Sequence, residues 1–152
     1  MIATEQISVQ IPPTSTKVLE NTGWHNEQQF ISREPVFIHG LIGKQIMGQL
    51  NGHLIIEREV QGNQFQEKHR YVQLNDVTVH QLKDVKMRRR GLGTSMVREL
   101  EKITLKFGAA KITGIISTRD LENQPWLPKF YKQLGFILTE NGGGYNLEKA
   151  LG

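Results

Sequence analysis

A loop of three arginines and two glycines could bind an anion. It reads Arg88-Arg89-Arg90-Gly91-Leu92-Gly93 and lies between a segment of alternating apolar and polar residues and a segment of helical periodicity. Where a strand leads into a helix, backbone N–H groups and the positive end of the helix dipole point into one small volume. Glycine lets a phosphate approach the main chain, and arginine adds charge-assisted contacts. The residues alone leave open an anion site, a basic patch for nucleic acid and a solvated turn.

Two common phosphate-binding patterns do not match this loop. A P-loop ends in Gly-Lys-Ser/Thr, whereas Gly93 is followed by Thr94. A dinucleotide fingerprint requires a third glycine where this chain has Met96. Nucleic-acid binding is favoured by the basic run at residues 86–90, but this run has no interleaved aromatic residues on which bases could stack. We therefore rank nucleic acid well below a small anionic cofactor at this loop.

The composition excludes several kinds of chemistry. The chain has no cysteine, so it can form neither a disulfide nor a site built on thiolates. Its histidines show no metal-ligand spacing, and we expect no metal. The formal charge of +4 favours anionic partners without requiring them. No apolar run approaches the ~20 residues that span a bilayer, and the N-terminus has no signal-peptide pattern. We therefore expect a cytoplasmic protein without membrane contact.

The half of the chain before the loop predicts antiparallel strands. Residues 1–30 are polar and receive no assignment. Asn51-Gly52 is the dipeptide that most favours a two-residue hairpin turn, and the alternative is one long strand with a bulge at Gly52. A polar loop is expected at residues 62–69. The apolar runs and alternating segments mark short strands at residues 36–38, 45–50 and 53–60, and residues 70–74 and 77–82 are expected to form one or two further strands.

The half of the chain after the loop adds helices to the sheet. Residues 112–117 are β-branched and uncharged, which is typical of a central strand covered on both faces. The elements around this strand are a helix over residues 96–107 that stops at Gly108 and a closing hairpin around residues 141–144. A second helix runs through residues 130–134 and stops at Gly135, with Pro125 and Pro128 before or within its first turn. The order predicts a mixed α/β (α+β) sheet in a single domain over residues 1–152, with residues 1–30 the least defined part.

Two motifs resemble those of the GNAT N-acyltransferase family. Arg88-x-x-Gly91-x-Gly93, at a strand-to-helix junction, resembles the family's acetyl-CoA motif Q/R-x-x-G-x-G/A. Further along, Phe130-Tyr131-Lys132-Gln133-Leu134-Gly135-Phe136 is similar to the family's FYxKLGF segment, and the expected buried strand lies between the two motifs. The resemblance covers roughly residues 70–150. It implies a mixed, mostly antiparallel sheet flanked by helices, whose fourth and fifth strands splay apart around acetyl-CoA.

The resemblance also implies which residues contact acetyl-CoA. Backbone N–H groups of the loop would hold the diphosphate, and the main chain near Val85 would pair with the pantetheine arm. In several members an asparagine before the last helix contacts the coenzyme, and Asn123 is the nearest counterpart. The coenzyme-binding residues implied in this way are Val85, Arg88, Arg89, Arg90, Gly91, Leu92, Gly93, Thr94 and Asn123.

Transfer of an acetyl group to an amine requires three kinds of group. A backbone N–H at the splayed end of the fourth strand would stabilise the developing oxyanion. Tyr131, at the position of the family's tyrosine, would be the general acid that protonates the departing thiolate. The general base stays open, because any of several side chains near that strand could activate the amine. These candidates are Asp76, His80, Glu57 and Glu59, with His80 of the residue type best suited to neutral pH.

The function implied is that of an acetyl-CoA-dependent N-acetyltransferase. Its acceptor would be a primary amine of unknown identity, on a small molecule or a peptide. Homodimers are frequent in the family, although no segment of this chain specifies one. The alternative is a GNAT-like module that binds acyl-CoA as a sensor or structural ligand and transfers nothing.

Overall fold

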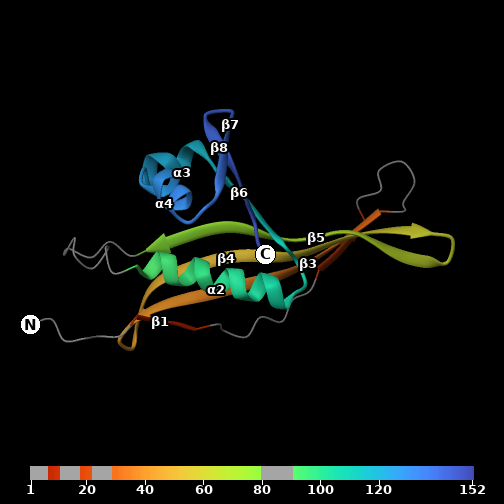
Figure 1. The fold of residues 1–152 in the computed structure, drawn as a ribbon, viewed down its shortest axis with the longest axis horizontal. Helices are drawn as coiled ribbons and strands as arrows, with labels where there is room; N and C mark the ends of the chain where they lie inside the picture. The colour runs from red at the N-terminus through yellow and green to blue at the C-terminus, as the bar shows by residue number, and fades with distance from the viewer. Residues whose placement is uncertain (1–6, 11–17, 22–28, 80–90) are drawn as a thin grey trace, which may run out of the picture.

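A computed structural model describes residues 7–10, 18–21, 29–79 and 91–152, which form a mixed sheet with helices packed on it (Figure 1). Neighbouring strands follow the order β1-β3-β4-β5-β6-β8-β7, and β2 also pairs with β3. The strands are β1 (Ile7–Gln10), β2 (Val18–Asn21), β3 (Gln29–Ile42), β4 (Gln45–Gln61), β5 (Gln64–Val79), β6 (Lys111–Ile116), β7 (Ile137–Asn141) and β8 (Gly144–Ala150). The helices are α2 (Leu92–Lys106), α3 (Thr118–Asn123) and α4 (Leu127–Gln133). The predicted α+β class with a mostly antiparallel sheet is confirmed.

The strands β3, β4 and β5 are longer than the sequence predicted. Their tight turns contain Gly43 and Gly62, at φ 62° and 66°, and not Asn51-Gly52. The predicted hairpin at Asn51-Gly52 is therefore wrong, and the alternative of one long strand with a bulge is confirmed by the register shift between these two residues. A Cβ on Gly52 would lie 2.7 Å from the carbonyl oxygen of Gln73. Glycine is required there for a close approach of strands and not for a turn.

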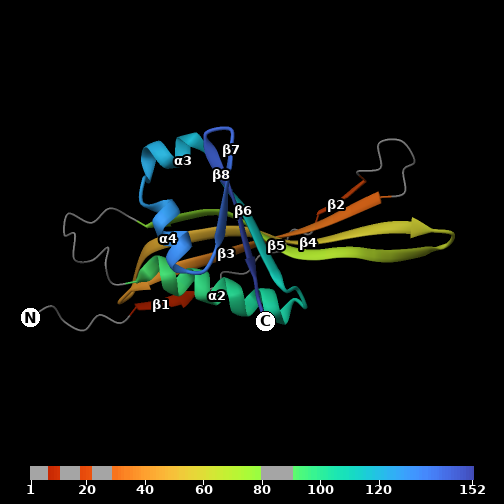
Figure 2. The same cartoon turned by 45° about the horizontal axis from the view of Figure 1, so that its top comes forward.

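The predicted polar loop at residues 62–69 is also wrong, because residues 64–69 are the start of β5. Here β3, β4 and β5 extend beyond α2 as an arm that comprises residues 29–34, 55–61 and 64–71 (Figures 1 and 2). Residues 62–69 are exposed throughout. A strand that meets solvent on both faces has no apolar alternation, and alternation was the signal on which the prediction depended.

Helix α2 agrees with the predicted helix. Its apolar face is buried, and the chain reverses after it at Gly108, at φ 83°, as predicted. The helix connects the parallel strands β5 and β6, which need a crossover of this kind. It packs closely on β3 and β4, because a Cβ on Gly40 would lie 2.7 Å from Leu92. The buried residues of the helix are Leu92, Gly93, Met96, Val97, Leu100 and Thr104.

Strand β6 occupies the predicted central position but is not covered on both faces. It pairs with β5 on one side and with β8 on the other. Ile112 and Ile116 are buried in the core, whereas Ile115 is 59% exposed. Only one face of this strand is therefore buried. A β-branched composition is expected for a strand with one buried face as well as for a strand with two, so the sequence could not distinguish them.

The segment after β6 contains a helix that the sequence analysis missed. Helix α3 starts at a capping box in which the Ser117 hydroxyl accepts from the Asp120 N–H and the Asp120 carboxylate accepts from the Ser117 N–H. This Ser-x-x-acidic spacing was visible in the sequence. The predicted stop at Gly135, at φ 93°, and the closing β7–β8 hairpin are confirmed.

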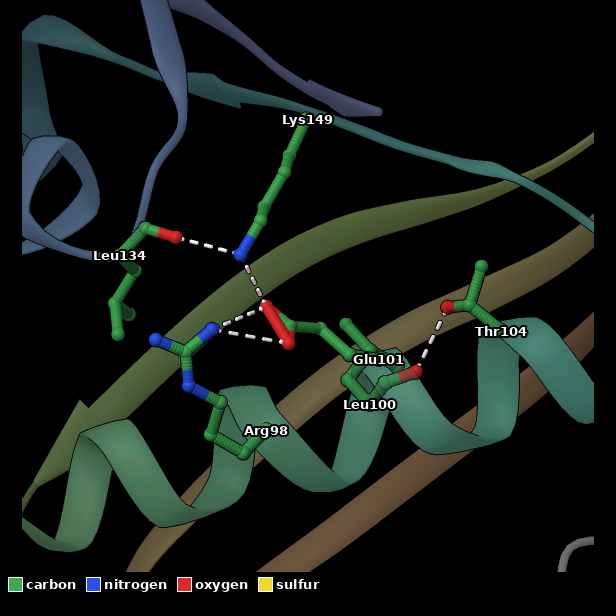
Figure 3. A network of polar contacts seen from close by, with 6 residues as sticks. All are labelled: Arg98, Leu100, Glu101, Thr104, Leu134 and Lys149. Carbon is green, nitrogen blue, oxygen red and sulfur yellow. Dashed lines mark hydrogen bonds and ion pairs between the residues drawn. The ribbon is translucent and has the colours of Figure 1, made fainter. Parts of the chain in front are cut away.

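A partly buried ion pair joins the C-terminal strand to α2 (Figure 3). The Lys149 ammonium donates to Glu101 Oε1 at 2.5 Å and to the carbonyl oxygen of Leu134 at 2.6 Å. Arg98 also donates to the Glu101 carboxylate, at 2.8 Å. Lys149 thereby connects β8, the end of α4 and the middle of α2.

Candidate functional site

The central strands β5 and β6 pair over a short distance and then separate. Their parallel pairing runs only from Val72 with Ile112 to Leu74 with Gly114. Beyond that point β5 continues to Val79 and β6 to Ile116 without pairing to each other. The two strands therefore leave backbone groups unpaired at the splayed end of the sheet. This confirms the splayed central strands that the resemblance implied.

A bulge in β5 lies at the point where the strands separate. Gly52 pairs with Leu74 and Asn51 with Asp76, so Asn75 is the extra residue. The extra residue of a bulge leaves the ladder, so its backbone N–H is not committed to the neighbouring strand. The side chain of Asn75 is held by His53, with His53 Nδ1 2.6 Å from Asn75 Oδ1. The bulge therefore brings the backbone of the extra residue, an amide and an imidazole to one place.

The glycine loop begins α2 with a geometry suited to an anion. Gly91 is the N-cap residue at φ 77° and provides no side chain to cap the helix. The first turn contains no acidic residue, and a Cβ on Gly91 would meet no atom of the described residues within 4 Å. The first N–H groups of a helix have no partner within it, and they attract anions. Gly91, Leu92, Gly93 and Thr94 thus fit the diphosphate of a coenzyme, with Leu92 contributing only its backbone because its side chain is buried in the core.

The second glycine of the loop connects the two motifs. A Cβ on Gly93 would lie 3.1 Å from Phe130 Cζ, so the absence of a side chain makes room for this ring. Phe130 in turn packs edge-on against Trp126 and Tyr131, with ring centroids 5.3 and 5.2 Å away. The contact brings the start of α2 and the helix α4 together. The two motifs are therefore in contact in the fold.

Tyr131 is more deeply buried than its neighbour Phe130. It is 3% exposed and packs against Phe136, with the ring centroids 5.3 Å apart. Burial, and then the nearby carboxylates of Asp76 and Asp120, raise the pKa of Tyr131 well above its usual range. The phenol is protonated at neutral pH, and the raised pKa makes it a weaker acid than an exposed tyrosine. The influence of Asp76 shows that the tyrosine lies near the splayed end of β5.

The base candidates from the sequence lie in different parts of the sheet. Asp76 follows the bulge at the splayed end, where the hydroxyl of Thr78 donates to its carboxylate at 3.0 Å. Glu57 lies on the arm and accepts from the Tyr71 hydroxyl at 2.9 Å. Glu59 is farther along the arm and pairs with Lys68 at 3.1 Å. Only Asp76 of these three lies where the central strands separate.

The remaining predicted site residues are Asn123, which the structure describes, and five residues outside the described ranges. Asn123 is the exposed last residue of α3, and its side chain makes no hydrogen bond to another residue in the described ranges. The residues that lie outside the described part of the chain are His80, Val85, Arg88, Arg89 and Arg90. Within the described residues, no three His, Asp or Glu side chains form a group that could hold a metal ion. None of the described helices is long and apolar enough to cross a membrane.

His53 and Asn75 lie beside the opening between β5 and β6, and the sequence analysis assigned neither to the site. His53 was considered only as a metal ligand, and Asn75 was not singled out. Their contact depends on the register of β4 with β5 and on the extra residue at Asn75. Neither residue belongs to a motif, so spacing along the chain could not have identified them.

Comparisons with known proteins support the fold. No family model and no curated protein matches the sequence. Among solved structures, Arabidopsis thaliana NAA60 in complex with acetyl-CoA is similar, at 10% identity and a TM-score of 0.55, over 76% of this chain and 76% of that one. A Desulfovibrio desulfuricans protein assigned to the GNAT acetyltransferases is similar at 12% identity and a TM-score of 0.54, over 78% and 70% of the two chains. Arabidopsis thaliana Naa50 with the bisubstrate analogue CoA-Ac-MVNAL is similar at 16% identity and a TM-score of 0.50, over 76% and 72%. The chain therefore has the fold of the GNAT N-acetyltransferases.

Proposed function

We propose that this protein is an acetyl-CoA-dependent N-acetyltransferase that transfers an acetyl group to a primary amine. The observation that carries the proposal is the separation of β5 and β6 after Leu74 and Gly114, beside a helix that begins with the open Gly91. One opening in the sheet thus adjoins an anion-binding helix end and a protonated tyrosine. Similar folds with acetyl-CoA or a coenzyme A analogue bound support the same ligand here.

Each group at the opening between β5 and β6 would have its own role in acetyl transfer. The N–H groups at the start of α2 bind the diphosphate, which fixes the thioester at the bulge. The backbone N–H at Asn75 or Asp76 stabilises the negative charge that develops on the carbonyl oxygen, a contribution of ~3 kcal/mol in other enzymes. Tyr131 protonates the sulfur as it leaves. Bound acetyl-CoA supplies the activated acetyl group, and the chain supplies position, charge stabilisation and protons.

The proposal is tested by binding and by turnover. Calorimetric titration of acetyl-CoA into the full chain is expected to give a single site. Release of coenzyme A thiol is then followed with putrescine, tobramycin, a lysyl peptide and the free N-terminus of the peptide MVNAL. Acetyl-CoA-dependent release with at least one amine supports the enzyme. Binding without release from any amine would instead favour an acyl-CoA-binding module, and absence of binding would exclude both.

A further inference from the structure

His53 and Asn75 form a side-chain pair at the edge of the opening between β5 and β6, and neither residue belongs to a motif. His53 lies on β4 between Gly52 and Leu54, whose positions face the core, so alternation directs its side chain to the opposite face. Asn75 is exposed, and His53 is half-buried. The pair therefore lies on the face of the sheet opposite the core, with His53 beside Gln73 and Asn75 one residue beyond the last β5–β6 partner at Leu74.

The contact between the two side chains fixes which nitrogen of the ring carries a proton. His53 Nδ1 lies 2.6 Å from Asn75 Oδ1, and an amide oxygen can only accept a hydrogen bond. The neutral imidazole must therefore carry its proton on Nδ1, which leaves a lone pair on Nε2. An amide or carboxylate that orients a histidine in this way is the arrangement that makes histidine a general base in hydrolases.

We infer that His53, oriented by Asn75, is the general base that activates the acceptor amine. This inference rests on the proposed function. Asp76 is the other base candidate at this position, and it is exposed and accepts a hydrogen bond from Thr78. Imidazole is the stronger base of the two side-chain types. The sequence left the general base open, and it is here assigned to His53, whose side chain contacts Asn75 in the bulge.

The reaction balances with these groups. The acceptor ammonium gives one proton to His53 Nε2, and the neutral amine nitrogen forms its bond to the carbonyl carbon. That nitrogen then loses a second proton to solvent. The C–S bond breaks, and the electron pair of this bond leaves with the sulfur as a thiolate. Tyr131 gives its proton to the thiolate and recovers one from solvent, and His53 releases its proton to solvent. One net proton appears for each amide formed.

The test uses three substitutions at His53 and Asn75 in the full chain. His53→Asn keeps a donor at the place of Nδ1 but has no base, and His53→Ala has neither. Both variants are expected to lose ~100-fold in kcat/KM for the amine that turns over best, with the acetyl-CoA dissociation constant unchanged. Added imidazole is expected to restore activity to His53→Ala only. Asn75→Ala, which removes the acceptor for Nδ1, should lower kcat/KM and leave the acetyl-CoA dissociation constant unchanged. The matched control is His69→Ala on the exposed arm, which should behave as the wild type.

The outcomes separate the base assignment from the proposed function. If the wild type binds acetyl-CoA and turns over, but His53→Asn retains full activity, then His53 only positions the bulge and the inference is wrong. Unchanged activity in His53→Ala together with a large loss in Asp76→Asn would assign the base to Asp76 instead. If the wild type neither binds acetyl-CoA nor releases thiol with any amine, the proposed function itself fails.

Discussion

The two glycines at the start of α2 are required for different physical reasons. Gly91 has a left-handed backbone, and no atom of the described residues lies within 4 Å of the place where a side chain would stand. Gly93 is buried, and its missing side chain admits the ring of Phe130. One glycine therefore serves binding and the other serves packing. The motif alone does not distinguish these uses.

This difference predicts the effect of Gly91→Ala. Alanine in the left-handed region should lower the free energy of unfolding by ~1 kcal/mol, and its methyl group would enter the space proposed for the diphosphate. We expect the acetyl-CoA dissociation constant to rise at least ~10-fold, which corresponds to ~1.4 kcal/mol. Calorimetry measures the binding and denaturant titration measures the stability.

The control for Gly91→Ala is Gly62→Ala. Gly62 has a similar φ of 66° and also has no atom within 4 Å of a built Cβ, but it lies in the turn of the arm. The two variants should lose similar stability, and only Gly91→Ala should lose coenzyme affinity. Equal affinity in both variants would show that the loop does not bind the coenzyme.

Tyr131→Phe tests the general acid at the same scale. Phenylalanine retains the ring contacts with Phe130 and Phe136 and removes only the proton donor. We expect kcat to fall ~100-fold while the acetyl-CoA dissociation constant stays within about twofold of the wild type. Steady-state kinetics and calorimetry give the two values. An unchanged kcat would leave Tyr131 as a core residue only.

At the scale of elements, β8 holds α2 and α4 in position through Lys149. Its ammonium reaches Glu101 on α2 and the carbonyl oxygen of Leu134 at the end of α4. Because α2 begins with the glycine loop and α4 contains Tyr131, the ion pair fixes the separation of two parts of the proposed site. The contact is partly buried, since the Lys149 and Glu101 side chains are 16% and 15% exposed.

Lys149→Met is therefore expected to lower the free energy of unfolding by ~2 kcal/mol, because Glu101 and the Leu134 carbonyl lose a charged partner in a partly buried place. The control is Lys111→Met, which removes an ion pair with Glu148 whose side chains are 48% and 56% exposed. An exposed pair contributes less than ~1 kcal/mol. Denaturant titration of both variants gives the comparison, and equal losses would contradict a structural role for Lys149.

Elements with local signals could be predicted from the sequence, and those set by strand pairing could not. Helix α2, the stops at Gly108 and Gly135 and the final hairpin follow from periodicity and backbone preference within a few residues. The bulge at Asn75 and the use of Gly52 depend on the close approach of β4 and β5, which no local pattern encodes. The glycine loop and Tyr131 were found through a resemblance, whereas His53 required the register.

At the scale of the whole molecule, the sheet has two differently built ends. The splayed end adjoins the helices, and the arm at the other end projects beyond them as strands alone (Figure 2). On the arm, the hydroxyl of Tyr71 on β5 donates to the carboxylate of Glu57 on the neighbouring strand β4. Burial, and then this hydrogen bond and the charge of Glu57, raise the pKa of Tyr71 to about 12.

The raised pKa of Tyr71 makes stability depend on alkaline pH. Tyrosine in the unfolded chain has a pKa of ~10, so the folded state holds this proton more tightly. The stabilisation is complete below pH ~10 and is lost as the pH rises toward the folded pKa of about 12. The free energy of unfolding should therefore fall over this range less steeply in Tyr71→Phe than in the wild type. The slope that remains includes Tyr131, whose raised pKa acts in the same direction. Identical slopes would show that Tyr71 does not contribute.

The most direct test of the central claim is a crystal structure of the protein with acetyl-CoA. We predict that the pantetheine lies between β5 and β6 beyond Leu74, with the diphosphate on the N–H groups at Gly91 to Thr94 and the thioester at the Asn75 bulge. Coenzyme bound on another surface, with the opening between β5 and β6 left empty, would contradict the proposed site.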